Sequence, residues 1–245
     1  MQDFNIISLS ESALLIQFGN EINMHLHEQV MLAKEILEGN PFDGFIETVP
    51  AYNSLAVYFN PFKIIRGRTS IADTVKKEIE LRLTVNHDRP KSSHTQCLIT
   101  IPVCYDESFG IDLITLSEKL QLSTEELIQL HCSKTYKVYM TGFTPGFPYM
   151  GTLDERLFTN RKTSPRTKVE KGAVAIAGNQ TGIYPLNSPG GWNIIGRTPM
   201  QLFDVSKKNP FLLKAGDEVK FKAITKDEFY ETPSAVANPH GVLEK

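Results

Sequence analysis

The feature that most constrains the fold is a stretch of 58 residues, 142–199, in which glycine and proline are concentrated. It holds nine of the chain's 16 glycines and six of its 14 prolines. Glycine permits close backbone approach and positive φ, and proline favours turns, so such a stretch interrupts long helices and long strands. It therefore predicts many short strands joined by tight turns, as in an antiparallel β-barrel or sandwich.

The N-terminal part has a different pattern, which predicts a small α+β domain. Alternating apolar residues predict strands over 4–9, 13–18, 45–49 and 54–59. Apolar residues three and four positions apart predict helices over 21–37 and from Thr69 to Leu83, with Ile22, Leu26, Val30, Ala33 and Leu37 on the inner face of the first. A single sheet with both helices on one face would bury these residues.

A polar segment, residues 86–96, is the best candidate for a linker. We therefore expect two domains, an α+β domain over 1–88 and a mainly-β domain over 94–245. In the second domain we expect helices over 112–120 and 123–132, and Ser123 with Glu126 three residues later predicts a capping box at the start of the second helix. The expected strands are 97–103, 136–140, 173–177, 192–196, 201–204 and 218–224. The polar chain after residue 229 is expected to be loosely held.

Composition excludes several classes of function. With 41% hydrophobic and 22% charged residues and a formal charge of −2, the chain is typical of a soluble globular protein without the basic field that binds nucleic acid. No apolar run approaches the roughly 18 residues of a membrane span, and the N-terminus lacks the basic start of a secretory signal. We expect a cytoplasmic protein in which Cys97, Cys104 and Cys132 are reduced.

Two arginines of the glycine- and proline-rich stretch are candidates for catalysis through anion binding. Arg166 and Arg197 could each present a planar fork to a carboxylate or phosphate, although each could instead pair with a local acid. Asn179, Gln180 and Thr181 lie between two glycines, where they could line a ligand loop or form a β-turn. Among these three, Gln180 is the candidate for a catalytic positioning role.

Further candidates are backbone and aromatic groups that could contact a substrate or nucleotide. Gly190 and Gly191 could expose consecutive N–H groups to an oxyanion, or form a type II turn. Trp192, the one tryptophan, could stack on a ligand or pack in the core. The other aromatic candidates are Phe143, Phe147 and Tyr149.

Other motifs point away from well-known sites. The basic stretch Arg161–Lys171 could receive ATP phosphates but is more typical of a solvated hairpin. His25 and His27 do not share a helix face, so we expect an exposed helix surface there and no metal site. No Walker-type phosphate loop, G-x-S-x-G elbow or H-E-x-x-H motif is present in the sequence.

Four sequence blocks carry a resemblance to a known family. They are G-F-T-P-G-F-P-Y-M-G at 142–151, Pro165-Arg166, A-G-N-Q-T-G-I-Y-P at 177–185, and S-P-G-G-W at 188–192 followed by I-G-R-T-P. With residues 44–55, they resemble the allophanate hydrolase subunit 1 family, which includes KipI and the 5-oxoprolinase subunit PxpB. The resemblance spans about 4–230, and Met150 and residues 169–172 depart from the family pattern.

The resemblance implies a cyclophilin-like β-barrel at the C-terminus and three alternative functions. The first is a subunit of an ATP-dependent 5-oxoprolinase, an ATP-hydrolysing amidohydrolase that opens 5-oxoproline to glutamate. Its cosubstrate would be ATP, with or without magnesium, and its partners a second subunit similar to allophanate hydrolase subunit 2 (PxpC-like) and a third large subunit. The second is a KipI-like inhibitor that binds a sporulation histidine kinase. The third is a carboxyltransferase component of a urea carboxylase or allophanate hydrolase system.

The 5-oxoprolinase hypothesis makes a specific structural prediction. A lactam carbonyl is a poor electrophile, and phosphorylating its oxygen would allow water to open the ring. Such a site needs cations for the phosphate and carboxylate, so the four blocks are expected to converge on one hollow that holds Arg166 and Arg197. No general base can be named, which favours a site shared with another protein chain.

Overall fold

The computed structural model describes residues 4–64, 70–85 and 98–233 of the chain. The chain divides into two compact units, Met1–Thr95 and Gln96–Lys245. The expected linker, 86–96, lies outside the described residues, as do Cys97 and the chain from 234 onward. The domain limits of 1–88 and 94–245 stay a prediction, and each unit is described by itself.

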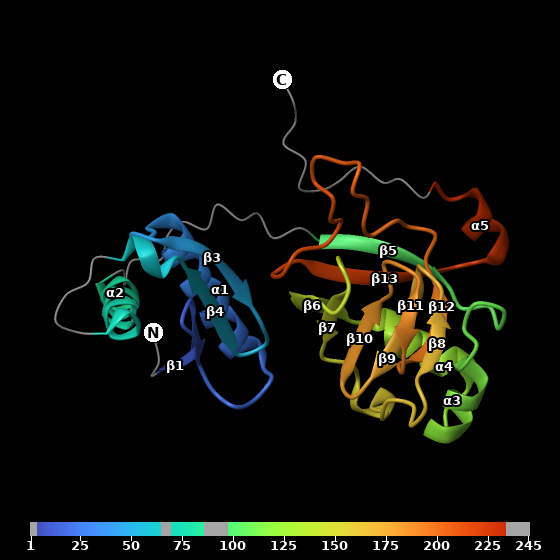
Figure 1. Ribbon diagram of the computed structural model, residues 1–245. Coiled ribbons are helices and arrows are strands. Elements are labelled where there is room, and N and C mark those ends of the chain that lie inside the picture. The colour runs from blue at the N-terminus through green and yellow to red at the C-terminus, as the bar shows by residue number, and fades with distance from the viewer. Residues whose placement is uncertain (1–3, 65–69, 86–97, 234–245) are drawn as a thin grey trace. The chain divides into compact units, whose positions relative to one another are not determined.

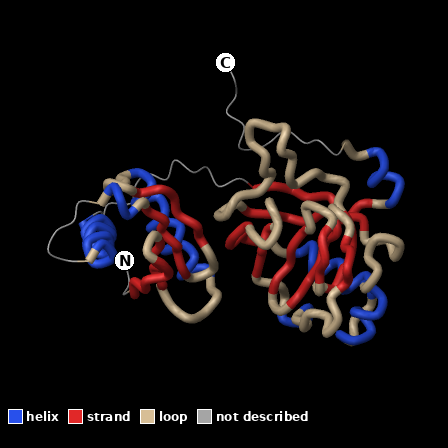
Figure 2. Tube along the Cα trace, in the orientation of Figure 1, coloured by secondary structure: helices blue, strands red, loops and turns tan. Residues whose placement is uncertain are grey.

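The first unit is a four-stranded antiparallel sheet in the order β1-β2-β4-β3 (Figures 1 and 2). The strands are β1 (Asn5–Ser10), β2 (Ala13–Gln17), β3 (Phe45–Pro50) and β4 (Ser54–Phe59), and a short 3-10 turn, η1 (Pro61–Lys63), follows them. Helices α1 (Met24–Gly39) and α2 (Ile71–Val85) pack against one face of the sheet, where their apolar residues share one core with those of β2 and β4. The expected α+β unit is thus present.

The first helix begins later than its apolar pattern predicts. Val30, Ala33 and Leu37 are fully buried as expected, but Ile22 precedes the helix and is exposed. The Asn23 side chain accepts a hydrogen bond from the Leu26 N–H and caps α1, so the chain before it is free to leave the helical path.

The start of the second helix differs from the expectation in a similar way. The Ser70 hydroxyl accepts a hydrogen bond from the Asp73 N–H at 3.1 Å. Thr69, the expected cap, lies outside the described residues. The inward residues of α2 are Val75, Ile79 and Leu83, as the helical spacing predicts.

The second unit is a closed β-barrel, which confirms the predicted fold class. Its strands follow the order β10-β7-β6-β13-β5-β12-β9, and β10 pairs again with β9 (Figure 1). The barrel strands are β5 (Leu98–Cys104), β6 (Thr135–Thr141), β7 (Pro148–Gly151), β9 (Ala173–Ala177), β10 (Gln180–Ile183), β12 (Asn193–Arg197) and β13 (Glu218–Ile224). The antiparallel expectation is wrong for one pair, because β5 and β13 run parallel in register from Leu98 and Glu218 onward.

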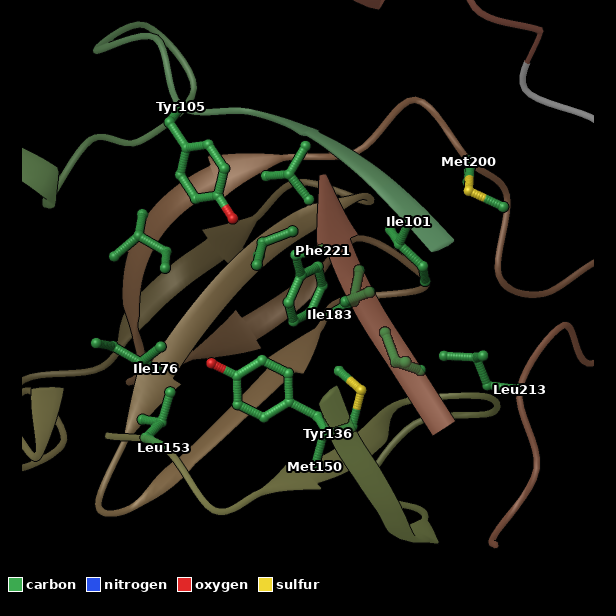
Figure 3. Packing of buried hydrophobic residues seen from close by; sticks show 14 of the residues in the cluster. Ile101, Tyr105, Tyr136, Met150, Leu153, Ile176, Ile183, Met200, Leu213 and Phe221 are labelled. Atoms are coloured by element: carbon green, nitrogen blue, oxygen red, sulfur yellow. The ribbon is translucent and has the colours of Figure 1, made fainter. Parts of the chain in front are cut away.

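Large apolar side chains fill the interior of the barrel. Figure 3 shows Ile176 of β9 facing the same interior as Tyr136, Ile183 and Phe221, all of them buried. Helices α3 (Leu113–Leu120) and α4 (Thr124–Ser133) add side chains to this core. The capping box expected at the start of α4, between Ser123 and Glu126, is present.

Several elements differ from those expected in the second unit. Strands β7 and β10 of the glycine- and proline-rich stretch were not expected. The same stretch also contains a two-stranded ribbon of β8 (Arg166–Val169) and β11 (Ser188–Gly190), and a short 3-10 turn, η2 (Glu155–Leu157), precedes the ribbon. The expected strand over 201–204 is wrong: Phe203 forms only an isolated bridge with Phe211. Met200 and Leu202 of this loop are both buried against the barrel core. Their spacing of two residues gives the loop the alternating apolar pattern of a strand.

A short helix ends two residues into the chain that was expected to be loosely held after residue 229, and the rest of that chain from 234 onward lies outside the described residues. Helix α5 (Lys226–Glu231) begins with a capping box between Thr225 and Glu228, and this helix was not predicted. None of the described helices is long and apolar enough to cross a membrane.

Candidate functional site

An aromatic pocket of about 230 Å³ gathers residues from all four sequence blocks, together with Arg161. Its lining consists of Phe143, Phe147, Tyr149, Arg161, Pro165, Tyr184, Pro189, Gly190, Gly191 and Trp192. We call this the aromatic pocket. Residues that lie up to 49 positions apart in the sequence thus meet at one place, 143 and 192 being the outermost.

The aromatic pocket lies on the outer face of the barrel. Along β9, Val174 and Ile176 belong to the interior core, whereas Ala173, Ala175 and Ala177 belong to a separate cluster with the pocket aromatics. Successive side chains of a strand point to opposite faces, so these alanines are on the outside of the barrel. Their small side chains leave room for a layer of rings above the strand.

That layer is built from rings that meet edge to face. The centroid of the Phe147 ring lies 5.1 Å from that of Tyr184 and 5.4 Å from that of Trp192, at interplanar angles of 81° and 82°. Gly182 of β10 permits this packing, because a Cβ there would lie 2.8 Å from Phe147 Cζ. At Gly190 a Cβ would lie 2.2 Å from the Tyr184 hydroxyl oxygen, so this glycine is also required by close approach.

The β8–β11 ribbon forms one wall of the aromatic pocket. The buried carboxylate of Asp112 binds two cations at the start of this ribbon and just before it. Asp112, just before α3, accepts hydrogen bonds from Lys162 Nζ at 2.9 Å and Arg166 Nη2 at 2.6 Å. Its other oxygen accepts the Ile194 N–H at 2.8 Å. Burial acts to raise the pKa of Asp112, but the three hydrogen bonds together outweigh burial and lower it. Asp112 is therefore a charged clamp between α3, β12 and the ribbon.

Two phenols and one guanidinium supply the polar side chains of the aromatic pocket. Burial raises the pKa of Tyr149 and of Tyr184, and the opposing effect of Arg161 on both is smaller. Both phenols therefore stay protonated at neutral pH and can donate hydrogen bonds. The Arg161 guanidinium carbon lies 5.7 Å from the centroid of the Trp192 ring, within the range of a cation–π contact.

The structure places six of the predicted site residues in the aromatic pocket. They are Phe143, Phe147, Tyr149, Gly190, Gly191 and Trp192. Phe143 has a φ of 66° and an exposed side chain at the rim, whereas Trp192 is buried. The sequence pattern indicated Arg161 only as part of a basic stretch, and it did not single out Tyr184. Their positions in the sequence could have indicated them, because Arg161 lies shortly before Pro165-Arg166 and Tyr184 lies near the end of the third block.

The two predicted catalytic arginines do not line the aromatic pocket. Arg166 is held by Asp112, and Arg197 of β12 donates to Glu170 Oε2 at 2.8 Å and to the Lys171 carbonyl at 3.1 Å. The structure thus assigns them to different acids and does not bring both into this hollow. Their catalytic roles stay predictions.

The predicted trio at 179–181 also lies outside the pocket lining. Gly178, with a φ of 60°, and Asn179 form the two-residue turn between β9 and β10, and Gln180 begins β10. Thr181 is fully buried and points into the barrel, where its hydroxyl lies 2.8 Å from His131 Nε2. His131 Nδ1 lies 2.7 Å from the Tyr105 hydroxyl, and burial lowers the pKa of His131 to about 3. This buried network was missed because it joins residues 50 positions apart.

Two smaller expectations also change. His27 is fully buried, with Nδ1 3.3 Å from the Ala51 carbonyl oxygen, so the expected exposed helix surface is wrong at this residue. A second hollow of about 480 Å³ gathers acids, among them Asp106, Glu107 and Glu125. It repels carboxylates and phosphates, so the aromatic pocket is the better candidate for an anionic ligand.

Comparison with known proteins identifies the family. Residues 4–213 match the family model described as "Carboxyltransferase domain, subdomain C and D". The chain belongs to this family. It is 41% identical to the 5-oxoprolinase B subunit of Bacillus subtilis (strain 168), over 93% of this chain and 95% of that protein. It is 36% identical to the 5-oxoprolinase B subunit of Haemophilus influenzae, over 89% and 96% of the two chains.

A solved structure confirms the fold of this family member. The crystal structure of TTHA0988 superposes with a TM-score of 0.74 and 35% sequence identity, and the match covers 86% of this chain. The chain spans about 40% of the TTHA0988 chain, so that protein continues beyond the matched region.

Proposed function

We propose that this chain is one subunit of a 5-oxoprolinase, which opens the lactam ring of 5-oxoproline to glutamate with hydrolysis of ATP. The observation that carries the proposal is its match to the 5-oxoprolinase B subunits along nearly the full length of both chains. The aromatic pocket supports it independently, since it offers a small hollow with flat walls and hydrogen-bond donors.

The chemistry of the aromatic pocket suits a small cyclic amide. The Trp192 and Phe147 rings offer flat apolar surfaces to the lactam ring. The protonated phenols of Tyr149 and Tyr184 can donate hydrogen bonds to an oxygen that gains negative charge. Phosphorylation of the lactam oxygen would make the lactam carbon electrophilic. Water would add to that carbon, and the C–N bond would break with the ring nitrogen leaving as the protonated amine. Hydrolysis of the resulting γ-glutamyl phosphate would then give glutamate and phosphate. We assign no general base to this chain.

The nucleotide requires more room than the aromatic pocket offers. Its 230 Å³ lie below the roughly 300–1,000 Å³ of sites for drug-sized ligands. We therefore assign the lactam to the aromatic pocket and place ATP at a surface that the assembled enzyme completes. No group of three or more possible metal-ligating side chains occurs within the described residues, and we derive no step through magnesium.

The partners are proposed from the organisation of the relatives. The Bacillus subtilis and Haemophilus influenzae relatives are each named as one subunit of a 5-oxoprolinase, and the TTHA0988 chain carries this unit together with additional chain. We propose that the partner is the second subunit of the same system, joined by a third large subunit. In a shared site, the partner would supply the general base that we do not assign to this chain.

A carboxyltransferase activity is the second candidate, and the description of the family favours it. In that case the aromatic pocket would hold the small amide that accepts a carboxyl group from a biotin carrier. The reaction would then require bicarbonate and the carrier. One reconstitution experiment therefore separates the two enzyme activities.

The test is reconstitution of this chain with its second and third subunits. We expect 5-oxoproline to stimulate ATP hydrolysis with formation of glutamate, and we expect both to disappear when this chain is left out. Turnover that persists without this chain would overturn the proposal. Turnover that needs bicarbonate and a biotin carrier would replace it with the carboxyltransferase.

A further inference from the structure

Among the residues that the structure describes, Arg161 is the one charged side chain that lines the aromatic pocket. Two neighbouring cations are already paired with an acid: Lys162 and Arg166 share the single carboxylate of Asp112. Arg161 makes no ion pair with an acid in the part of the chain that the structure describes, and its side chain is exposed. It is therefore the cation that can meet an incoming anion at low cost.

The surroundings of Arg161 orient its charge toward the aromatic pocket. Its guanidinium lies against the Trp192 ring, and its charge acts on the hydroxyls of both Tyr149 and Tyr184. The lining contains no acidic side chain among the described residues. A ligand of this hollow is thus met by one planar cation, two phenols and aromatic walls, which together fit a small ring that carries a carboxylate.

We propose that Arg161 binds the carboxylate of 5-oxoproline and is the specificity residue of the aromatic pocket. This inference rests on the proposed function. The guanidinium forms charge-assisted hydrogen bonds with the carboxylate while the lactam ring lies on the aromatic wall. The sequence predicted that Arg166 and Arg197 bind the substrate anion, but both are paired with local acids. The proposal assigns this role to Arg161, which was not among the predicted site residues.

The test compares two substrates in the reconstituted enzyme. 5-Oxoproline carries the carboxylate, whereas 2-pyrrolidinone keeps the lactam and lacks the carboxylate. Substrate-dependent ATP hydrolysis is measured for wild type, Arg161→Gln, Arg161→Lys and the control Arg156→Gln. Arg156 is an exposed arginine of the same unit that pairs with Asp154 and lies outside the aromatic pocket.

We expect Arg161→Gln to lower kcat/KM for 5-oxoproline roughly 10- to 100-fold, mainly through KM, the scale of one hydrogen-bonded charge pair. The value for 2-pyrrolidinone and the KM for ATP should change less than twofold. Arg161→Lys should recover part of the loss, and Arg156→Gln should behave as wild type.

If Arg161→Gln lowers kcat/KM equally for both substrates, Arg161 has a structural role and the inference is overturned. An unchanged KM for 5-oxoproline would also overturn it. A wild-type enzyme that does not use 5-oxoproline would instead overturn the proposed function itself. The two failures are therefore distinguishable.

Discussion

At the scale of single residues, glycines determine the space that the aromatic pocket leaves. Gly182→Ala would bring a Cβ to 2.8 Å from Phe147 Cζ and 3.0 Å from the Pro148 carbonyl oxygen. We expect this change to lower the free energy of unfolding by about 1–3 kcal/mol, the usual cost of overpacking, and to weaken ligand binding. Urea denaturation measures the first effect.

The matched control is Gly142→Ala in the same unit, where the nearest neighbour of a Cβ, Met140 Cε at 3.5 Å, lies at an ordinary contact distance. If the two variants lost equal stability, close packing of Phe147 on β10 would not be the cause.

The buried His131 predicts a dependence of stability on pH. Burial lowers its pKa to about 3 in the folded protein, whereas an unfolded histidine has a pKa near 6.5. Between these values the unfolded chain binds a proton that the folded chain does not, so stability falls as the pH decreases from about 6.5 toward 3. Its share of the slope is up to about 1.4 kcal/mol per pH unit.

The variant His131→Phe keeps a ring to stack on Phe221 and removes the titrating group. We expect its unfolding free energy, measured by urea denaturation from pH 7 to 4, to decline less steeply than that of wild type. Thr181→Val removes the hydroxyl near His131 Nε2 but keeps the imidazole, so it should retain the steep decline. Parallel pH profiles for wild type and His131→Phe would contradict the assignment.

At the scale of elements, Asp112 connects the ribbon wall to α3 and β12. Asp112→Asn removes the charge that Lys162 and Arg166 share. Because both cations are partly exposed, we expect a cost of about 1–3 kcal/mol, below that of a fully buried pair. Amide hydrogen exchange of residues 166–169 should become faster.

Asp106→Asn is the control, since Asp106 is a partly exposed acid that pairs with Lys226 and not with a residue of the ribbon. If the amide hydrogens of β8 exchange equally slowly in both variants, packing alone stabilises the ribbon. The lowered pKa of Asp112 also means that its contribution is present above the unfolded pKa and is lost as the pH falls through the folded value.

Local patterns predicted the elements that depend on neighbours in the sequence. The apolar spacing of α2, the capping box of α4 and the alternation of β13 all depend on residues a few positions apart, and the structure confirms them. The ribbon strands β8 and β11 were not predicted, because they are short and polar. Arg166, the first residue of β8, donates a hydrogen bond to Asp112, which lies 54 residues earlier in the chain.

At the scale of the whole molecule, the parallel pair β5 and β13 closes the barrel across more than a hundred residues of chain. No local signal specifies such a pair. The same limit applies to the candidate site. The aromatic residues of the blocks were identified from the sequence, but the sequence does not show that Asp112 pairs with Arg166 and Glu170 with Arg197.

The two units have separate apolar cores, and every residue of the aromatic pocket belongs to the second. We therefore expect residues 96–245 alone to fold with the aromatic pocket intact. The emission spectrum of Trp192, the one tryptophan of the chain, and far-ultraviolet circular dichroism check this expectation. A red-shifted emission like that of the denatured fragment would show that the barrel depends on the first unit.

The most direct test that the aromatic pocket is the ligand site is a titration of Trp192 emission with 5-oxoproline. Trp192 lies in the lining and is otherwise buried, so its emission reports on the aromatic pocket alone. We predict a saturable change that Arg161→Gln shifts to higher concentration. A flat titration to millimolar 5-oxoproline, with a reconstituted enzyme that turns over the same compound, would contradict this account.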